Sequence, residues 1–292
     1  MRFLYALILL GVTAVWGWTF VVVQDAISVY GVMPFLAARF LLAACALIPF
    51  TLRRITRRTL VAGAGVGLVL AMGYLFQTLG LLYTTPTNSG LITGMFVVFA
   101  PLSDRLLFGV RIPRPVLVAV VLSFAGMVLL AGGNPDGVNF GDLLTLICAA
   151  ALGLQIALLS RYAAGHDSLG FASVETSVMA LLFAAVWVLS GDVSFPPRSV
   201  WMALIVTGLL ASAAAFWAQT FVQQRLPAAR AAVILTMEPV FAALFGYWLA
   251  GDRLDAVQIA GAVLILSALF VGEMLPFFSR RRTKKGLPSD PV

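Results

Sequence analysis

Ten long apolar blocks divide the chain, and short stretches of polar residues, glycine and proline separate them. A block of about 20 apolar residues is long enough to cross the hydrocarbon core of a membrane as a helix. We expect helices rather than open sheets, because lipid cannot satisfy exposed backbone groups. The pattern therefore predicts an all-α membrane protein whose ten transmembrane helices cover residues 4–24, 32–52, 61–82, 89–108, 115–132, 140–160, 169–190, 199–222, 228–250 and 255–276.

The basic residues predict how these helices lie in the membrane. Of the 292 residues 61% are hydrophobic and 11% are charged. All 19 Lys and Arg residues except Arg39, Arg198 and Arg253 fall at the termini or in every second gap. Because Lys and Arg in short loops are retained in the cytoplasm during insertion, we expect both termini there. We expect a multi-pass protein of the bacterial inner membrane.

Other functional classes lack the residues they need. The net charge of +7 is spread over short loops, which favours contact with anionic membrane lipids over nucleic-acid binding. The two cysteines, Cys45 and Cys148, both fall inside predicted spans, so we expect no disulfide framework and no metal cluster. One histidine, His166, and no phosphate-binding glycine loop argue against an enzyme or a bound cofactor.

The chain contains an internal repeat. Residues 75–130 align with residues 217–272 at an offset of 142, and residues near 17–39 align with 153–175 at an offset of 136. Each half holds five spans, and five is odd, so the second half enters the membrane in the opposite sense. Such inverted repeats are typical of secondary transporters. We expect a first repeat at 1–135, a second at 136–279 and a basic cytoplasmic tail at 280–292. The matched residues are Gln77-Thr78 with Gln219-Thr220, Phe99 with Phe241, Gly109-Val110-Arg111 with Gly251-Asp252-Arg253, Gly17 with Gly153, Phe35 with Phe171, and Arg39 with Glu175.

Three stretches carry a family resemblance. ILTMEPVFAALFGYWLAGDRLDAVQIAGAVLILSALF, from Ile234 to Phe270, resembles the second repeat of the EamA branch of the drug/metabolite transporter superfamily. VWGWTFVV near Trp16 and AARFLLAA around Arg39 resemble the opening of its first repeat. The resemblance implies a ten-helix carrier that exports amino acids, including aromatic ones, by alternating access. The first half has Phe96-Val97 where the second has Glu238-Pro239, so any role of the Glu-Pro pair belongs to the second half.

Glu238 is the most deeply placed carboxylate. An unpaired charge inside a membrane is unfavourable by several kcal/mol, so we expect Glu238 to be neutral or partnered. One interpretation is a proton site or an attraction point for a substrate amine. The other is a cap on the backbone group that Pro239 frees.

Arg39 and Glu175 occupy matching positions in spans 2 and 7. Inversion places them roughly 12 Å apart along the membrane normal, so we expect no direct ion pair. One interpretation is that both side chains snorkel to the surface or bind helix ends. The alternative is that each contacts a substrate carboxylate, a substrate amine or a gate partner on its own side.

Aromatic and amide side chains form the predicted substrate site. Tyr74 and Gln77 share one face of span 3 at three-residue spacing, and Phe216 and Gln219 share the matching face of span 8. Gln155 follows Gly153 as Thr19 follows Gly17. Among the tryptophans we expect Trp217, rather than Trp16 or Trp18, to face the substrate. The same residues could instead join helices to one another.

Several questions stay open from the sequence. A carrier of drugs or other metabolites, or a flippase of an amphipathic lipid-linked group, uses the same kind of helices. The direction of transport, coupling to protons and assembly into a homo-oligomer are not encoded in a pattern that we can interpret.

Overall fold

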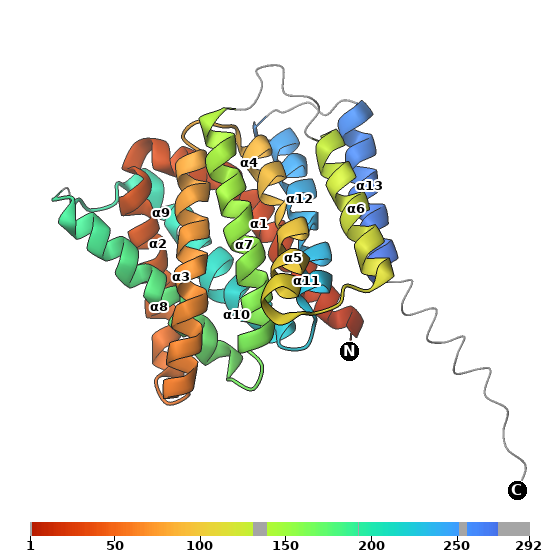
Figure 1. The fold of residues 1–292 in the computed structure, drawn as a ribbon. Coiled ribbons are helices and arrows are strands. Elements are labelled where there is room, and N and C mark those ends of the chain that lie inside the picture. The colour runs from red at the N-terminus through yellow and green to blue at the C-terminus, as the bar shows by residue number, and fades with distance from the viewer. Residues whose placement is uncertain (1, 131–138, 192, 251–255, 274–292) are drawn as a thin grey trace, which may run out of the picture.

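A computed structural model describes residues 2–130, 139–191, 193–250 and 256–273, and these residues form a bundle of helices (Figure 1). Each predicted span corresponds to a helical segment in this part of the chain, so the prediction of an all-α, ten-helix fold is confirmed. The segments are α1 (Arg2–Tyr30), α2 (Val32–Thr51), α3 (Arg57–Gly80), α4 (Pro86–Thr93) with α5 (Phe96–Phe108), α6 (Arg114–Leu130), α7 (Phe140–Tyr162), α8 (Ser168–Leu189), η1 (Arg198–Val200) with α9 (Trp201–Ile205), η2 (Val206–Ala214) and α10 (Ala215–Gln223), α11 (Ala228–Leu235) with α12 (Met237–Phe245) and η3 (Gly246–Ala250), and α13 (Ala256–Glu273).

Eight of the helical segments in the described ranges are long and apolar enough to cross a membrane, judged by length and composition. Shorter apolar helices cover 114–129 and 259–268. The first helix continues six residues beyond its predicted end, and Gly31, with φ of 82°, turns the chain directly into α2. The predicted tail at 280–292 and the repeat match at Gly251-Asp252-Arg253 lie outside the described residues.

The helices pack as two equivalent sets. The contact of α1 with α12 corresponds to the contact of α7 with α5, and the contact of α2 with η2 corresponds to that of α8 with α3. Two further pairs, α2 with α8 and α6 with α13, join equivalent helices of the two halves. In Figure 1, α7 begins at the upper end whereas α1 begins at the lower end. The packing is therefore that of two repeats that run in opposite senses.

Two equivalent glycines allow close approach between helices. A Cβ atom on Gly17 of α1 would lie 2.7 Å from the backbone nitrogen of Ala242 in α12. A Cβ atom on Gly153 of α7 would lie 2.8 Å from the backbone nitrogen of Ala100 in α5, and would also meet Phe99. Ala100 and Ala242 are themselves related by the offset of 142. Both contacts exclude any side chain larger than hydrogen.

The helices that pack on these glycines are interrupted at the same place. The fourth span breaks between Thr93 and Phe96, and the ninth breaks at Thr236, so each consists of two short helices in line. The eighth span contains a second irregularity, the π-helical turns of η2. Interrupted helices and π-helical turns are frequent at binding sites, because they place backbone and side-chain polar groups toward a cavity.

Candidate functional site

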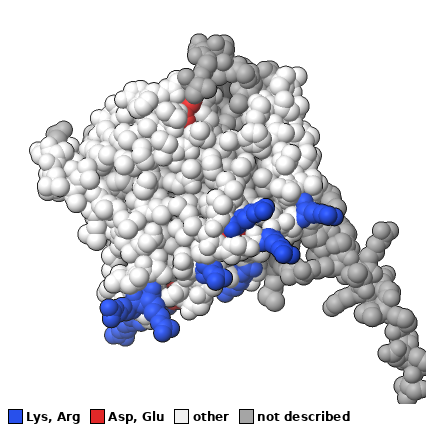
Figure 2. Space-filling model, in the orientation of Figure 1, with Lys and Arg blue, Asp and Glu red and all other residues white. Residues whose placement is uncertain are grey.

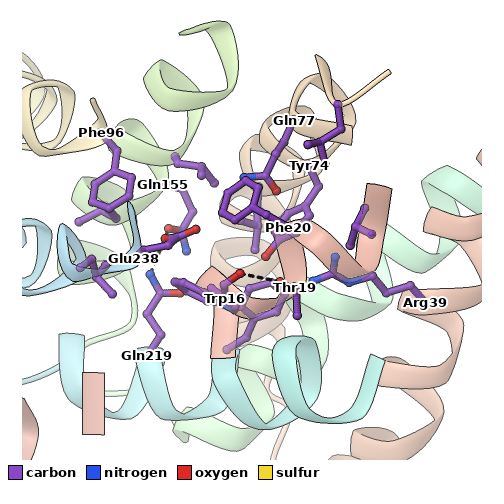
Figure 3. Close-up of a pocket in the computed structure, with 17 residues that line it drawn as sticks. Trp16, Thr19, Phe20, Arg39, Tyr74, Gln77, Phe96, Gln155, Gln219 and Glu238 are labelled. Carbon is purple, nitrogen blue, oxygen red and sulfur yellow. Dashed lines mark hydrogen bonds between the residues drawn. The ribbon is translucent and has the colours of Figure 1, made fainter. Parts of the chain in front are cut away.

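A cavity lies between the two repeats, where the interrupted helices meet α1, α2, α3, α7 and α10 (Figure 3). Its lining contains six pairs of residues that the offsets of 136 and 142 relate to each other. The cavity therefore surrounds the axis that relates the repeats. The pairs are Trp16 with Leu152, Thr19 with Gln155, Phe20 with Ile156, Tyr74 with Phe216, Gln77 with Gln219, and Phe96 with Glu238.

Aromatic rings form much of the wall. The Phe216 ring lies 5.7 Å from the Tyr74 ring in a T-shaped contact and 6.0 Å from the Trp16 ring, centroid to centroid. The indole nitrogen of Trp16 donates a hydrogen bond of 2.8 Å to the carbonyl of Ala211 in η2. The free volume is about 40 Å³, much less than the volume of about 300–1,000 Å³ that is typical of ligand pockets. The cavity is therefore narrow in this arrangement of the helices.

Glu238 stands at the start of α12, at the helix break, and is 4% exposed. Its side chain forms no hydrogen bond or ion pair with any other residue that the structure describes. The interpretation of Glu238 as a cap therefore has no hydrogen bond to support it in this part of the chain. Its equivalent at the start of α5 is Phe96, also buried against the cavity. One repeat supplies a carboxylate where the other supplies a phenyl ring.

Arg39 reaches the cavity from α2 and is 2% exposed. Its Nε donates a hydrogen bond of 2.9 Å to Ser212 Oγ in η2, and its guanidinium carbon lies 4.7 Å from the centre of the Tyr74 ring. No carboxylate in the described ranges forms an ion pair with it. Figure 3 shows Arg39 and Glu238 on opposite sides of the cavity, with Phe20 between them. The interpretation that Arg39 snorkels to the surface is wrong, because the guanidinium points inward and contacts Ser212 and the Tyr74 ring. The alternative, that Arg39 contacts a substrate or a gate partner, stays a prediction.

The predicted amide residues line the cavity as well. Gln219 Nε2 donates to Gln155 Oε1 at 3.5 Å, and Gln77 Nε2 donates to Thr93 Oγ1 at 3.4 Å. Gln155 Nε2 is buried and has no hydrogen-bond partner among the described residues. Both hydrogen bonds are long, so these amides are free to exchange their partners for polar groups of a bound solute.

Glu175 does not line the cavity but lies behind it in α8. Thr220 Oγ1 donates a hydrogen bond of 3.4 Å to Glu175 Oε2, whereas Glu175 Oε1 is buried without a partner in the described part of the chain. Thr220 follows Gln219, which lines the cavity. Like Arg39, Glu175 is buried and does not snorkel. It forms no ion pair with Arg39, as the sequence predicted.

Glutamines hold the helices together at both ends of the cavity. At the end nearest the basic loops, Gln223 Nε2 of α10 donates to Ile156 O at 3.0 Å and to Ser160 Oγ at 2.9 Å, both in α7. At the opposite end, Gln24 Nε2 of α1 donates to Leu81 O at 3.2 Å and to Thr84 O at 3.1 Å. The offsets relate position 24 to 160 and position 81 to 223. We call these two sets of contacts the basic-end latch and the opposite latch.

The structure corrects one further site prediction. Trp217 is 45% exposed and does not line the cavity, because it follows the inward-facing Phe216 by about 100° around the helix. Trp16 lines the cavity instead. Pro239 is buried beside the helix break, and its Cγ would lie 2.9 Å from a Cβ atom on Gly94, but it is not part of the wall. Reasoning from sequence missed Ser212 and both latches, although the repeat offsets link positions 24 and 160.

The outer surface shows where the basic residues gather. The Arg side chains drawn in Figure 2 gather toward the lower end of the molecule, which is the end at which α1 begins in Figure 1. No group of three or more His, Cys, Asp or Glu residues that could hold a metal ion exists among the described residues.

Comparison with known proteins gives consistent matches. The model of the EamA-like transporter family matches residues 3–132 and again residues 139–272. An uncharacterized transporter of Archaeoglobus fulgidus is 34% identical over 260 residues, which are 89% of this chain and 82% of that protein. The uncharacterized inner membrane transporter YedA of Escherichia coli strain K12 is 25% identical over 266 residues, with 88% and 87% covered.

A solved crystal structure has the same fold. It superposes with a TM-score of 0.74 at 20% sequence identity, over 94% of this chain and 97% of that one.

Proposed function

Since the chain belongs to the EamA-like transporter family and is a multi-pass membrane transporter, we propose that it exports amino acids, aromatic ones among them, across the inner membrane by alternating access. The name of the relative YedA supports the inner membrane as the location. The concentration of Arg at one end of the bundle supports a cytoplasmic position for that end and for both termini.

One observation carries the choice of substrate: Arg39 and Glu238 lie on opposite sides of one cavity, and neither has a partner of opposite charge in the described ranges. A buried charge without a counter-ion is unfavourable, and a ligand of opposite charge relieves that penalty. An amino acid brings a carboxylate for Arg39 and an ammonium for Glu238 in one molecule. The rings of Trp16, Phe20 and Phe216 suit an aromatic side chain.

The same geometry supports coupling of transport to protons. A carboxylate as buried as Glu238 is accompanied by either a proton or a cation. A substrate ammonium therefore competes with a proton for Glu238, so export of the amino acid and import of a proton share one site. Arg39 and Tyr74 are the other ionisable side chains of the described cavity wall.

In this proposal the two latches open in turn, so that the cavity is exposed first to one side of the membrane and then to the other. Opening of the basic-end latch would separate α10 from α7 and admit a solute from that side, while the opposite latch stays closed. The reverse opening would release it. The helix breaks at Thr93 and Thr236 lie beside the cavity and provide places where the short helices can tilt.

Reconstitution into liposomes tests the proposal. Protein-dependent flux would be measured for amino acids, aromatic amines without a carboxylate, aromatic acids without an amine, nucleosides, sugars, cationic drugs and a fluorescent phospholipid, each with and without a pH gradient. We expect amino acids to move fastest and a pH gradient that is acidic on the trans side to accelerate them. Preferential flux of cationic drugs or of the lipid would instead establish the drug carrier or the flippase.

A further inference from the structure

A second hollow lies on the outside of the bundle between α3 and α7, near the basic end, and shares no residue with the central cavity. Its free volume is about 790 Å³, within the range of about 300–1,000 Å³ that is typical of ligand pockets. We call it the lateral groove. It is lined by Arg57, Arg58, Val61, Ala62, Gly65, Val66, Leu158, Tyr162 and His166.

The walls of the lateral groove are apolar and open outward. Val61 is 68% exposed, and a Cβ atom on Gly65 would meet nothing within 4 Å. Together with Ala62, Val66 and Leu158 these residues form a wall without a polar side chain. In a membrane such a wall faces hydrocarbon, so its natural occupant is an acyl chain.

One end of the groove is basic and rigid. Arg57 and Arg58 begin α3 and are exposed, so both guanidinium groups are available to a ligand. Thr59 Oγ1 and His166 Nδ1 are hydrogen bonded at 2.9 Å, and Gln224 Nε2 donates to the carbonyls of Ala163 and His166 at 2.9 Å. The first bond joins the start of α3 to the turn after α7, and the other two join the end of α10 to the same turn. The basic end of the groove is therefore held by contacts within the protein.

We propose that the lateral groove binds one phospholipid with an anionic headgroup, whose phosphate lies on Arg57 and Arg58 and whose acyl chain lies along Val61, Gly65 and Leu158. Charge complementarity selects this occupant. Arginine binds phosphate oxygens through paired N–H donors, and basic pockets between membrane helices on the cytoplasmic side bind anionic headgroups. A bound lipid bridges α3 and α7, which carry Tyr74, Gln77 and Gln155 of the central cavity.

Thermal unfolding of the purified full chain in detergent tests this site without any transport assay, so its outcome is independent of the proposed substrate. Phosphatidylglycerol, phosphatidylcholine and inorganic phosphate would be added separately. We expect phosphatidylglycerol alone to raise the melting temperature by several degrees, since binding to the folded state stabilises it. Equal stabilisation by phosphatidylcholine, or the same effect from inorganic phosphate, would overturn the proposal.

Two matched pairs of variants locate the site. Replacing Arg57 and Arg58 together by Ala should remove the stabilisation, whereas replacing Arg111 and Arg114 by Ala, with the same loss of charge, should leave it unchanged. Gly65→Leu should block the acyl chain, whereas Gly11→Leu, at another helical glycine whose Cβ would meet nothing within 4 Å, should not. If both variants of a pair lose the stabilisation by phosphatidylglycerol, or if both keep it, the lipid binds elsewhere. If the double Arg variant does not fold, the glycine pair decides alone.

Discussion

The two interrupted helices that meet at the cavity break at equivalent positions but carry different side chains at the break. In both repeats a helix breaks at the same offset position and its second half packs on a glycine, Gly153 against α5 and Gly17 against α12. At the first turn after the break, the first repeat has Phe96 and the second has Glu238. The two helix breaks are equivalent in the backbone, while the side chains that line the cavity there are not.

Arg39 and Glu175 are also equivalent positions of the two repeats that differ in their side chains. Arg39 lies on the cavity wall, whereas Glu175 lies behind Thr220 of α10. A symmetric scaffold offers two nearly equivalent arrangements of the helices, as alternating access requires. An asymmetric set of side chains places one positive and one negative group on opposite sides of one cavity. The proposed function assigns the motion to the symmetric helices and the recognition of the solute to the asymmetric side chains.

The largest expected effect concerns the charge at the second break. Glu238→Gln keeps the shape of the side chain but removes its negative charge, so we expect amino-acid flux in liposomes to fall by about 10- to 100-fold, the value of a hydrogen bond between charged groups. Phe96→Leu at the equivalent position serves as the control and should change flux less than about threefold. Normal transport by Glu238→Gln across a range of pH would remove Glu238 from substrate and proton binding.

The next-largest expected effect concerns the two equivalent glycines on which the interrupted helices pack. Gly17→Ala and Gly153→Ala each place a methyl group against an alanine backbone nitrogen, so we expect each to destabilise the fold by about 1–3 kcal/mol. Thermal unfolding in detergent measures the loss, and Gly11→Ala is the control with no neighbour in reach. If one of the two glycines tolerates alanine and the other does not, the packing is less symmetric than the structure shows.

Arg39, on the cavity wall, should distinguish solutes that carry a carboxylate from solutes that do not. Arg39→Met keeps an unbranched apolar stem as far as the position of Nε and removes the charge, so we expect the apparent affinity for amino acids to fall about tenfold. The apparent affinity for aromatic amines that lack a carboxylate should change little. Glu175→Gln, at the equivalent position behind the cavity, is the control and should affect both solutes alike. If Arg39→Met lowers the apparent affinity for amines and for amino acids equally, Arg39 only supports the fold.

The smallest effect concerns the latches. In a protein with Cys45→Ser and Cys148→Ala, a cysteine introduced as Thr19→Cys would report access to the cavity by its rate of reaction with membrane-impermeant thiol reagents. Gln223→Ala should raise labelling from the basic end by about 2- to 10-fold, in keeping with the loss of ordinary hydrogen bonds. Gln24→Ala should raise it from the opposite end. Acceleration from the same side in both variants would contradict two separate latches.

The polar part of the cavity wall was largely predictable from the repeat, whereas most of its apolar residues were not. Tyr74, Gln77, Gln155 and Gln219 were chosen because polar and aromatic residues recur at matching positions, and all four line the cavity. Trp217 was chosen for its position between two such residues and faces outward. Helices that are apolar on all sides have no amphipathic stripe, so the pattern does not say which face meets lipid and which meets protein.

The sequence by itself determined the ten helices, the duplication and the distribution of basic residues. It could do so because a membrane permits only helices of a certain length, and because a duplication leaves matching residues at fixed offsets. Only the tertiary structure decided that Arg39 turns inward, that Glu175 lies behind the cavity and that Gln24 and Gln223 hold its two ends. Those outcomes depend on the rotation and close packing of neighbouring helices, which are set by contacts between residues far apart in the chain.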